Sequence, residues 1–259
     1  AAIEKGTLNR YTNIWPFEYT RVKLDNKEND YINASYIQYI DYISTQGPLP
    51  TTFEDFWTVV WNENSRVIVM LTKEEEMSRI KCHRYWPTEI ESIKTFGQIT
   101  VKFISETEQM SKSLPGSQND VEESLILRHF EISKNNQEPK LIQHLQYRGW
   151  QDYGVPDNPL GTLELVALAQ EWHSKFGHNA DLGPMIVHCS AGCGRTGAFC
   201  TIDTLITRLS SDSYLTREEQ AGELDPVYQT VSKFREQRMS MVQTLRQYVF
   251  CYEAILWWI

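Results

Sequence analysis

The 259-residue sequence has no apolar run long enough to span a bilayer, and its N-terminus has no signal-peptide pattern. Its formal net charge of −9 lacks the surplus of cations that nucleic-acid binding or broad attraction to anionic membranes requires. It also lacks a disulfide framework, because its five cysteines are odd in number and unevenly spaced: Cys82, Cys189, Cys193, Cys200 and Cys251. We therefore expect no nucleic-acid partner, no membrane contact by this chain and a reducing, cytoplasmic setting.

The size and composition favour one folded unit. Residues are 41% hydrophobic, which is enough for a sizeable core, and no linker-like stretch divides the chain. We expect one domain over residues 1–259, and a monomer. Apolar periodicity predicts strands at 66–72, 94–105, 124–132 and 140–147, and helices at 51–61, 161–176, 195–209 and 227–238. This alternation predicts an α/β fold, with a strongly twisted mixed sheet flanked by helices.

The most informative stretch is the ten residues from His188 to Gly197, His-Cys-Ser-Ala-Gly-Cys-Gly-Arg-Thr-Gly. A short apolar segment, Pro184–Val187, precedes it and reads as a buried strand. Apolar residues at helical spacing follow it from Arg195 to Leu209. A small-residue loop that opens a helix turns several backbone N–H groups inward at the positive end of the helix dipole. The pattern therefore predicts an anion-binding cradle.

Two residues of this loop carry chemistry. Cys189 is expected at the floor of the cradle, where the N–H groups and the helix end favour thiolate over thiol. Arg195, six residues later, can hold two phosphate oxygens in a bidentate fork. A thiolate facing a clamped phosphoryl group predicts covalent phosphoryl transfer. The nitrogen donors would stabilise the charge, so we expect no metal and no cofactor.

Three other interpretations of the loop are weaker. The glycines around Cys193 are also typical of an ordinary turn before a helix. His188, Cys189 and Cys193 could ligate zinc, but no fourth ligand lies at a finger-like spacing. Cys189 and His188 could form a protease pair, but the base of such a pair usually comes from far away in the sequence and its oxyanion hole needs no arginine.

The pattern His188-Cys189, five residues, Arg195-Thr196-Gly197 resembles the protein tyrosine phosphatase family, and the resemblance covers six ordered segments from Asn9 to Tyr252. It implies the phosphatase fold of that family and phosphotyrosine-containing proteins as substrates. It also implies that Thr196 stabilises the departing thiolate and that His188 orients the loop. The resemblance assigns phosphate binding to Arg195 and to the loop amides of Ser190, Ala191, Gly192, Cys193 and Gly194.

Two further segments match loops of that family. Asn9-Arg10-Tyr11 resembles its phosphotyrosine-recognition loop, in which Tyr11 would stack on the substrate ring and Asn13 would bond the substrate backbone. The charged run from Glu74 to Cys82 is typical of a solvated surface. It also resembles the family's glutamate loop, in which Glu76 would brace Arg195 and Lys81 would face the acid loop.

The last two segments complete the expected mechanism. Trp150-Gln151-Asp152 falls where the family carries its mobile Trp-Pro-Asp loop, so Asp152 would be the general acid and then the base. Gln151 replaces the proline, and we expect this loop to close less readily. Gln243 and Gln247 match the two glutamines that position the hydrolytic water.

Two rival functions remain. A weakly active domain that captures phosphotyrosine proteins would fit Gln151, although Cys189, Arg195, Asp152 and Gln243 are all present. A dual-specificity phosphatase is disfavoured by the chain length and by the segment at Tyr11, which predicts a deep pocket. Because the sequence begins at Ala1 and not at methionine, we expect a trimmed catalytic portion of a longer protein.

Overall fold

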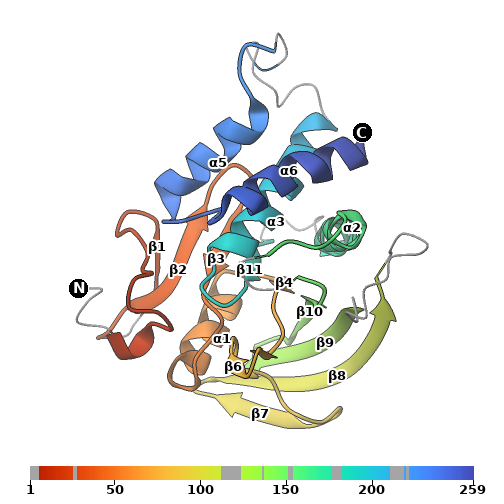
Figure 1. Ribbon diagram of the computed structural model, residues 1–259. Coiled ribbons are helices and arrows are strands. Elements are labelled where there is room, and N and C mark those ends of the chain that lie inside the picture. Colours follow the sequence, from red (N-terminus) through yellow and green to blue (C-terminus); the bar gives the residue numbers. More distant parts are fainter. Residues whose placement is uncertain are drawn as a thin grey trace.

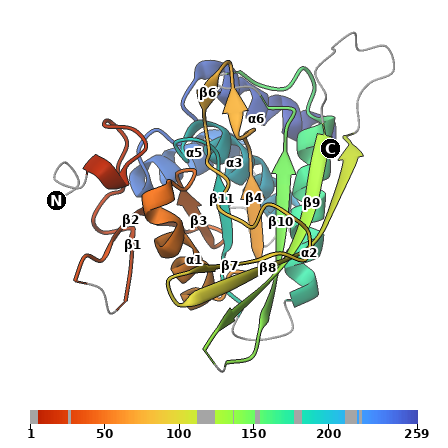
Figure 2. The same cartoon turned by 90° about the horizontal axis from the view of Figure 1, so that it is seen from below.

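A nine-stranded mixed sheet forms the centre of the computed structural model (Figures 1 and 2). The structure describes residues 6–25, 28–111, 124–135, 137–150, 154–176, 182–210, 219 and 222–259. The order of the strands in the sheet is β1-β2-β3-β11-β4-β10-β9-β8-β7. Their bounds are β1 Arg21–Lys23, β2 Tyr31–Ile37, β3 Tyr42–Thr45, β4 Val67–Met70, β7 Ile93–Phe96, β8 Ile99–Met110, β9 Ser124–Lys134, β10 Lys140–Tyr147 and β11 Met185–His188.

The four central strands β3, β11, β4 and β10 are parallel, and the outer strands pair antiparallel. Parallel strands place their carboxyl ends at one edge of the sheet, and ligand sites of α/β folds form beyond that edge. Cys189 directly follows β11 at this edge. A separate two-stranded hairpin, β5 (Glu75–Glu76) and β6 (Arg79–Ile80), follows β4 at the same edge (Figure 2).

Helices cover both faces of the sheet (Figure 1). One face packs against α2 (Leu160–Phe176), α3 (Gly194–Leu209), α5 (Pro226–Gln237) and α6 (Leu245–Trp258). The other face packs against α1 (Phe53–Asn62), and two short 3-10 helices, η1 (Gly6–Leu8) and η2 (Pro50–Thr52), lie in the N-terminal part of the chain. The expected α/β fold, with a large mixed sheet flanked by helices, is confirmed.

The alternation of side chains in the central strands explains why there are two hydrophobic cores. Val69 and Val187 face the cluster under α3, whereas Ile68 and Ile186, each one residue earlier, face the cluster under α1. A strand that is buried on both faces reads as a continuous apolar run. The two cores therefore hold β11, and with it the loop that follows, from both sides.

Helix α5 begins with a side-chain cap. The Asp225 carboxylate accepts hydrogen bonds from the N–H groups of Val227 (2.9 Å) and Tyr228 (3.1 Å), and Pro226 occupies the first helical position. Thr52 differs: it occupies the N-cap position of α1, but its hydroxyl bonds Leu49 in the preceding 3-10 turn and does not cap the helix.

The predicted strand over 94–105 is wrong in detail, because two antiparallel strands, β7 and β8, occupy this region. The chain reverses at Gly97, whose φ of +59° lies in the left-handed region that glycine tolerates. The turn explains the difference, since an isolated glycine within a strand pattern is a breaker signal.

A buried ion pair attaches the end of α3 to the segment that follows it. Arg208 Nη2 donates to Glu219 Oε2 at 2.5 Å, and the two side chains are 3% and 1% exposed. Arg208 Nη1 also donates to Thr230 Oγ1 in α5 at 3.2 Å. Glu219 is therefore a buried point in the connection between α3 and α5.

We predict that Glu219→Ala lowers the free energy of unfolding by about 3–5 kcal/mol, because it leaves the Arg208 guanidinium buried without its carboxylate partner. Urea denaturation followed by circular dichroism measures the change. Glu171→Ala is the control, since Glu171 forms only an exposed i,i+4 pair with Lys175 and its loss should cost less than about 1 kcal/mol. Equal costs for the two variants would contradict the prediction.

Candidate active site

The backbone carbonyls of the loop between β11 and α3 point away from its concave side and accept hydrogen bonds from neighbouring elements. His188 Nδ1 donates to the Cys189 oxygen at 3.1 Å, and the N–H of Gly47 donates to the Ser190 oxygen at 2.9 Å. Arg238, in the residue after α5, donates to the oxygens of Ala191 (Nη2, 3.0 Å) and Gly192 (Nε, 2.8 Å).

The outward carbonyls determine where the amides point. In a planar trans peptide the N–H points opposite to the C=O, so carbonyls held outward turn the following N–H groups inward. Gly192 makes the curvature possible, with φ of +71° and a backbone so close to β3 that a Cβ would lie 2.1 Å from the Thr45 oxygen. The loop is therefore a concave set of donors, as the sequence predicts.

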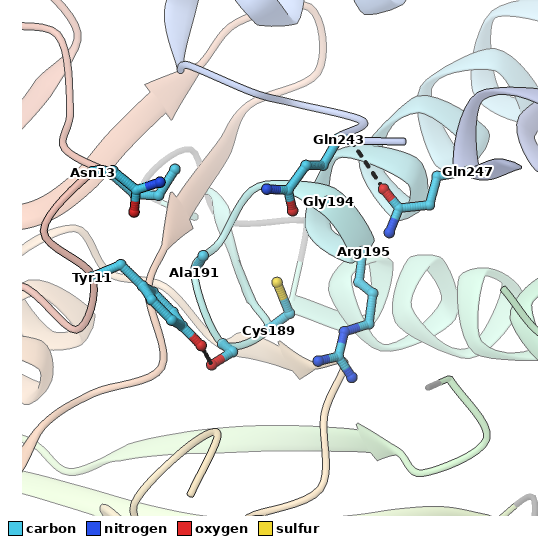
Figure 3. Close-up of a pocket in the computed structure, with 10 residues that line it drawn as sticks. Tyr11, Asn13, Cys189, Ala191, Gly194, Arg195, Gln243 and Gln247 are labelled. Atoms are coloured by element: carbon cyan, nitrogen blue, oxygen red, sulfur yellow. Dashed lines mark hydrogen bonds between the residues drawn. The ribbon is translucent and has the colours of Figure 1, made fainter. Parts of the chain in front are cut away.

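Cys189 is 4% exposed and lies in this concave loop (Figure 3). Burial alone would raise the pKa of its thiol, but the Arg195 guanidinium, the Thr196 hydroxyl and the backbone N–H groups of Thr196 and Cys193 together outweigh burial. The pKa of Cys189 therefore lies below its ordinary value. In contrast, burial raises the pKa of Cys193 to about 11. Of these two thiols only Cys189 has the character of a nucleophile.

The Arg195 side chain is held in place by two neighbouring segments. Its Nη1 donates to Glu76 Oε1 (2.7 Å) and to the Trp150 carbonyl (2.8 Å), and its Nη2 donates to Glu76 Oε2 at 3.2 Å. Glu76 accepts further hydrogen bonds from the Thr72 hydroxyl (2.8 Å) and the Lys73 N–H (3.2 Å). The guanidinium is 2% exposed, so its plane is set by these contacts and not by solvent.

The charged run from Glu74 to Cys82 forms the β5–β6 hairpin, which places Glu76 against Arg195. Its two turn residues, Met77 and Ser78, have φ of +48° and +57°, which is the pattern of a tight two-residue hairpin. This turn directs the strand of Glu76 toward Arg195. Lys81 is 8% exposed, and its carbonyl accepts a hydrogen bond from the Ser190 hydroxyl at 2.8 Å.

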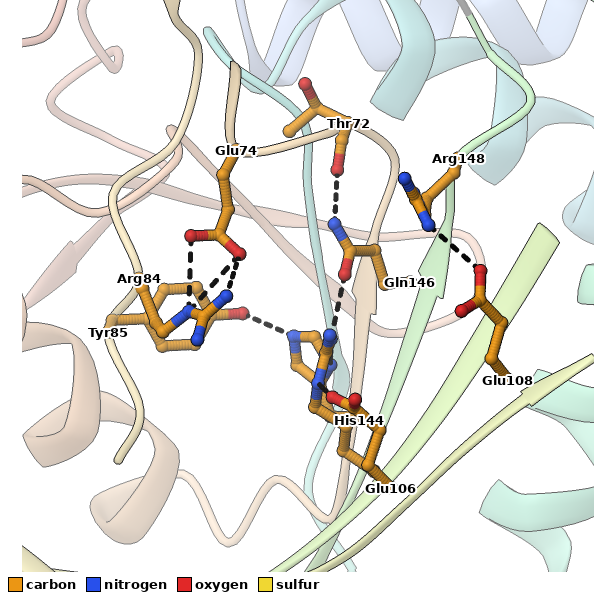
Figure 4. Close-up of polar contacts among 10 residues, drawn as sticks. Thr72, Glu74, Arg84, Tyr85, Glu106, Glu108, His144, Gln146 and Arg148 are labelled. Carbon is orange, nitrogen blue, oxygen red and sulfur yellow. Dashed lines mark hydrogen bonds and ion pairs between the residues drawn. The ribbon is translucent and has the colours of Figure 1, made fainter. Parts of the chain in front are cut away.

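A chain of hydrogen bonds behind the loop sets the tautomer of His188. Its Nδ1 must carry a proton, because the Cys189 carbonyl only accepts, and burial lowers the pKa of His188 to about 4. The neutral ring then accepts from the Tyr85 hydroxyl at Nε2 (2.8 Å). Tyr85 in turn accepts from His144 Nε2 (2.8 Å), and His144 Nδ1 faces Arg128 Nη1 at 3.5 Å (Figure 4).

The remaining wall of the site comes from both ends of the chain. The pocket is lined by Tyr11, Asn13, Ile14, Cys189, Ser190, Ala191, Gly194, Arg195, Gln243 and Gln247 (Figure 3). Tyr11 is half-buried, and its hydroxyl bonds the Ser190 hydroxyl at 2.8 Å. Asn13 is exposed at the rim.

The two glutamines play unequal parts in the geometry. Gln247 is 2% exposed, and its Oε1 accepts from the N–H groups of Gln243 (3.0 Å) and Thr244 (3.2 Å) in a capping box at the start of α6. Its amide nitrogen lies beside Gly194, so close that a Cβ added to Gly194 would be 2.9 Å from this nitrogen. Gln243 is exposed, and its amide extends over the loop.

The structure thus brings together the predicted loop residues with Tyr11, Asn13, Glu76, Trp150, Gln243 and Gln247. Asp152 and Gln151 lie outside the described residues. Sequence reasoning missed Ile14, Tyr85, His144 and Arg238. Of these, His144 alone carried a signal, as a histidine within an apolar strand segment. Among the described residues no group of three or more His, Cys, Asp or Glu side chains could hold a metal ion. None of the described helices is both long and apolar enough to cross a bilayer.

We predict that iodoacetamide alkylates Cys189 with a pH midpoint below that of an ordinary thiol, because the thiolate is the reactive form. Thr196→Val removes a hydroxyl that favours the thiolate form of Cys189, so the pKa rises and the midpoint of the pH–rate profile moves upward. Mass spectrometry of the peptide follows the reaction, and Cys193 should stay unmodified at neutral pH as an internal control. An unshifted midpoint would contradict the assigned role of Thr196.

Comparisons with known proteins agree with this geometry. The family described as "Protein-tyrosine phosphatase" matches residues 5–257. A Lar-like tyrosine-protein phosphatase of Caenorhabditis elegans is 40% identical over 96% of this chain and 10% of its own length. Receptor-type tyrosine-protein phosphatase alpha of Mus musculus is 37% identical over 95% of this chain and 27% of its own length. Tyrosine-protein phosphatase non-receptor type 9 of Homo sapiens is 37% identical over 96% of this chain and 41% of its own length.

The chain therefore spans less than half the length of each of these relatives, which include receptor-type and non-receptor proteins. The family match nevertheless covers nearly every residue, and the motif on which the resemblance rested forms the loop that holds a low-pKa cysteine beside a buried arginine. This chain belongs to the protein tyrosine phosphatase family.

Proposed function

We propose that this chain hydrolyses phosphotyrosine in proteins through a phosphocysteine intermediate. The observation that carries the proposal is the low-pKa thiol of Cys189 at the floor of a loop of inward N–H groups, beside a braced Arg195. A thiolate in that position can attack the phosphorus of a bound phosphoryl group, and the amides and the guanidinium stabilise the equatorial oxygens. The same loop amides and the Arg195 guanidinium stabilise the phosphoryl oxygens in both steps, so the proposed mechanism requires no metal.

In the first step the Cys189 sulfur forms a bond to phosphorus while the bond from phosphorus to the tyrosyl oxygen breaks. Asp152 gives its proton to that oxygen, since a phenolate is a poor leaving group. In the second step a water molecule attacks phosphorus, its proton goes to Asp152, and the phosphorus–sulfur bond breaks. Inorganic phosphate leaves, and Thr196 stabilises the regenerated thiolate.

The pocket walls support phosphotyrosine as the substrate class. Tyr11 and Asn13 lie on the side of the pocket opposite Gln243, with Cys189 below them (Figure 3), and Ile14 also lines the pocket. An aryl phosphate can reach the sulfur while its ring packs against Tyr11. The shorter phosphoserine side chain would have to draw its own backbone into the pocket.

The setting of the protein is part of the proposal. All five cysteines are free and buried, and a thiolate nucleophile needs a reducing compartment to stay reactive. We place the domain, residues 1–259, in the cytoplasm as a monomer that acts on phosphotyrosine-containing signalling proteins.

The test of the function is steady-state hydrolysis of a phosphotyrosine peptide in the presence of a metal chelator. We expect robust turnover, no turnover with Cys189→Ser, and a fall in kcat of about 10²–10⁴ with Asp152→Ala while the peptide stays bound. Asp157→Ala removes an exposed carboxylate from the same segment and is the matched control. A phosphoserine peptide should not be hydrolysed.

Two results would contradict the proposal. Tight binding of the phosphotyrosine peptide without turnover in the unmodified protein would mean a module that captures phosphotyrosine, and Gln151 would then be the residue to change. Turnover that survives Cys189→Ser would exclude the phosphocysteine intermediate.

A second prediction concerns the brace on Arg195. Glu76→Ala should lower kcat/KM for the peptide about 10- to 100-fold, because a charge-assisted hydrogen bond contributes about 1.5–3 kcal/mol and the freed guanidinium no longer keeps its plane. Glu75→Ala, which removes the exposed neighbouring carboxylate, should change kcat/KM less than about twofold. Similar values for the two variants would show that the brace has no role.

A further inference from the structure

The segment between α5 and α6 holds a residue in an unfavourable backbone conformation. Val242 has φ of +58°, and its side chain is branched at Cβ and fully buried. Left-handed φ values bring Cβ close to the neighbouring carbonyl, so a β-branched residue rarely adopts them. The chain must therefore be held in this conformation by other contacts. Val242 immediately precedes Gln243.

Arg235, in the last turn of α5, makes the contact that fixes Val242. Its Nε donates to the Met241 carbonyl at 2.9 Å, and its Nη2 donates to the Val242 carbonyl at 2.7 Å. These two carbonyls belong to the peptide planes on either side of the Val242 Cα. A guanidinium is a rigid planar fork, so binding both oxygens fixes the two planes relative to each other. The pair of bonds therefore sets φ and ψ at Val242.

The other contacts of this segment each hold only one of the two peptide planes. The Val242 N–H donates to the Cys193 carbonyl at 3.2 Å. The segment lies so close to α3 that a Cβ at Gly197 would be 2.3 Å from the Val242 nitrogen. Both contacts precede the Val242 Cα, whereas the bond from Arg235 to the Val242 carbonyl follows it. The Gln243 N–H holds the following plane separately through Gln247, so within the part of the chain that the structure describes Arg235 is the one side chain that binds both planes at once.

The conformation of Val242 decides where Gln243 points. The N–H of Gln243 donates to Gln247 Oε1 at 3.0 Å, and its side chain extends over the loop that contains Cys189 (Figure 3). Rotation of the peptide between Val242 and Gln243 would break this bond and swing the amide away from the pocket.

We propose that Arg235 is a positioning residue for hydrolysis of the phosphocysteine, acting by holding Val242 in the conformation that directs Gln243 at the attacking water. This inference rests on the function proposed above. In that step water forms the new oxygen–phosphorus bond, Asp152 takes the proton, and the bond from phosphorus to Cys189 sulfur breaks. Transfer of the phosphoryl group to Cys189 needs no oriented water. Loss of Arg235 therefore slows the second step alone.

The experiment uses a phosphotyrosine peptide for steady-state kinetics and p-nitrophenyl phosphate for stopped-flow measurements. Arg235→Met removes both donors and keeps the aliphatic part of the side chain. We expect kcat to fall about tenfold, since a small misplacement of a reacting group can cost up to 10²-fold. KM should fall with it, so that kcat/KM changes less than about twofold. A burst of nitrophenol should appear, and acid-quenched enzyme should carry a phosphoryl group on the Cys189 peptide.

A second substitution tests the mechanism of the effect. Glycine adopts positive φ at no steric cost, so Val242→Gly removes the need for the fork. On the Val242→Gly background we expect Arg235→Met to lower kcat less than about twofold. Lys233→Met is the matched control, because it removes a cation from the same helix whose ion pair is with the exposed Glu236. It should leave kcat and KM unchanged.

Several outcomes overturn the inference. Arg235→Met could behave like Lys233→Met, could lower kcat and kcat/KM equally, or could cost as much on the glycine background as on the native one. If Arg235→Met does not fold, Arg235→Lys makes the same comparison, because an ammonium cannot hold two carbonyls in one plane. An unmodified protein that hydrolyses no phosphotyrosine peptide would instead remove the proposed function, and this inference with it.

Discussion

The outward pull on the carbonyls between Cys189 and Gly192 is the constraint on which the site depends. Peptide planarity converts it into a set of inward N–H groups, so the cradle is created by what binds its back and not by anything in its interior. Elements from across the chain supply those bonds: the turn at Gly47 after β3, the ring of His188 in β11 and the guanidinium of Arg238 after α5. The depressed pKa of Cys189 follows from this arrangement and from Arg195, which together outweigh the cost of burial.

The end of α5 organises two loops at once. Arg238 holds the back of the phosphate-binding loop, and Arg235, one turn earlier, holds the two carbonyls around Val242. A strained residue of this kind costs about 1–3 kcal/mol, and the two charge-assisted hydrogen bonds from Arg235 are of the size needed to offset it. Neither arginine lines the pocket itself, yet each holds a segment that does. A helix that looks peripheral in Figure 1 is thus part of the functional architecture.

The sequence sufficed for the features that are local in the chain. Cys189 and Arg195 lie close together in the sequence, so their spacing alone predicted the cradle, and apolar periodicity predicted the helix that is α5. The resemblance to the family added distant segments such as Glu76. What stayed hidden depended on partners far apart in sequence: Tyr85 meets His188 across 103 residues, and Arg238 meets Gly192 across 46. No periodicity records such contacts, because a buried arginine at a helix end looks like a surface residue until its acceptors are known.

The hydrogen-bond chain behind Cys189 has a consequence for how the sequence can vary. Each donor in it is matched to one acceptor, and its direction is set at one end by the Cys189 carbonyl and at the other by the Arg128 guanidinium. A phenylalanine at Tyr85 would leave two imidazole nitrogens buried without partners, and a substitution of His144 alone would remove the donor to the tyrosyl oxygen. Single substitutions in this hydrogen-bond chain therefore disturb their buried neighbours, and the costs of two such substitutions are not expected to add.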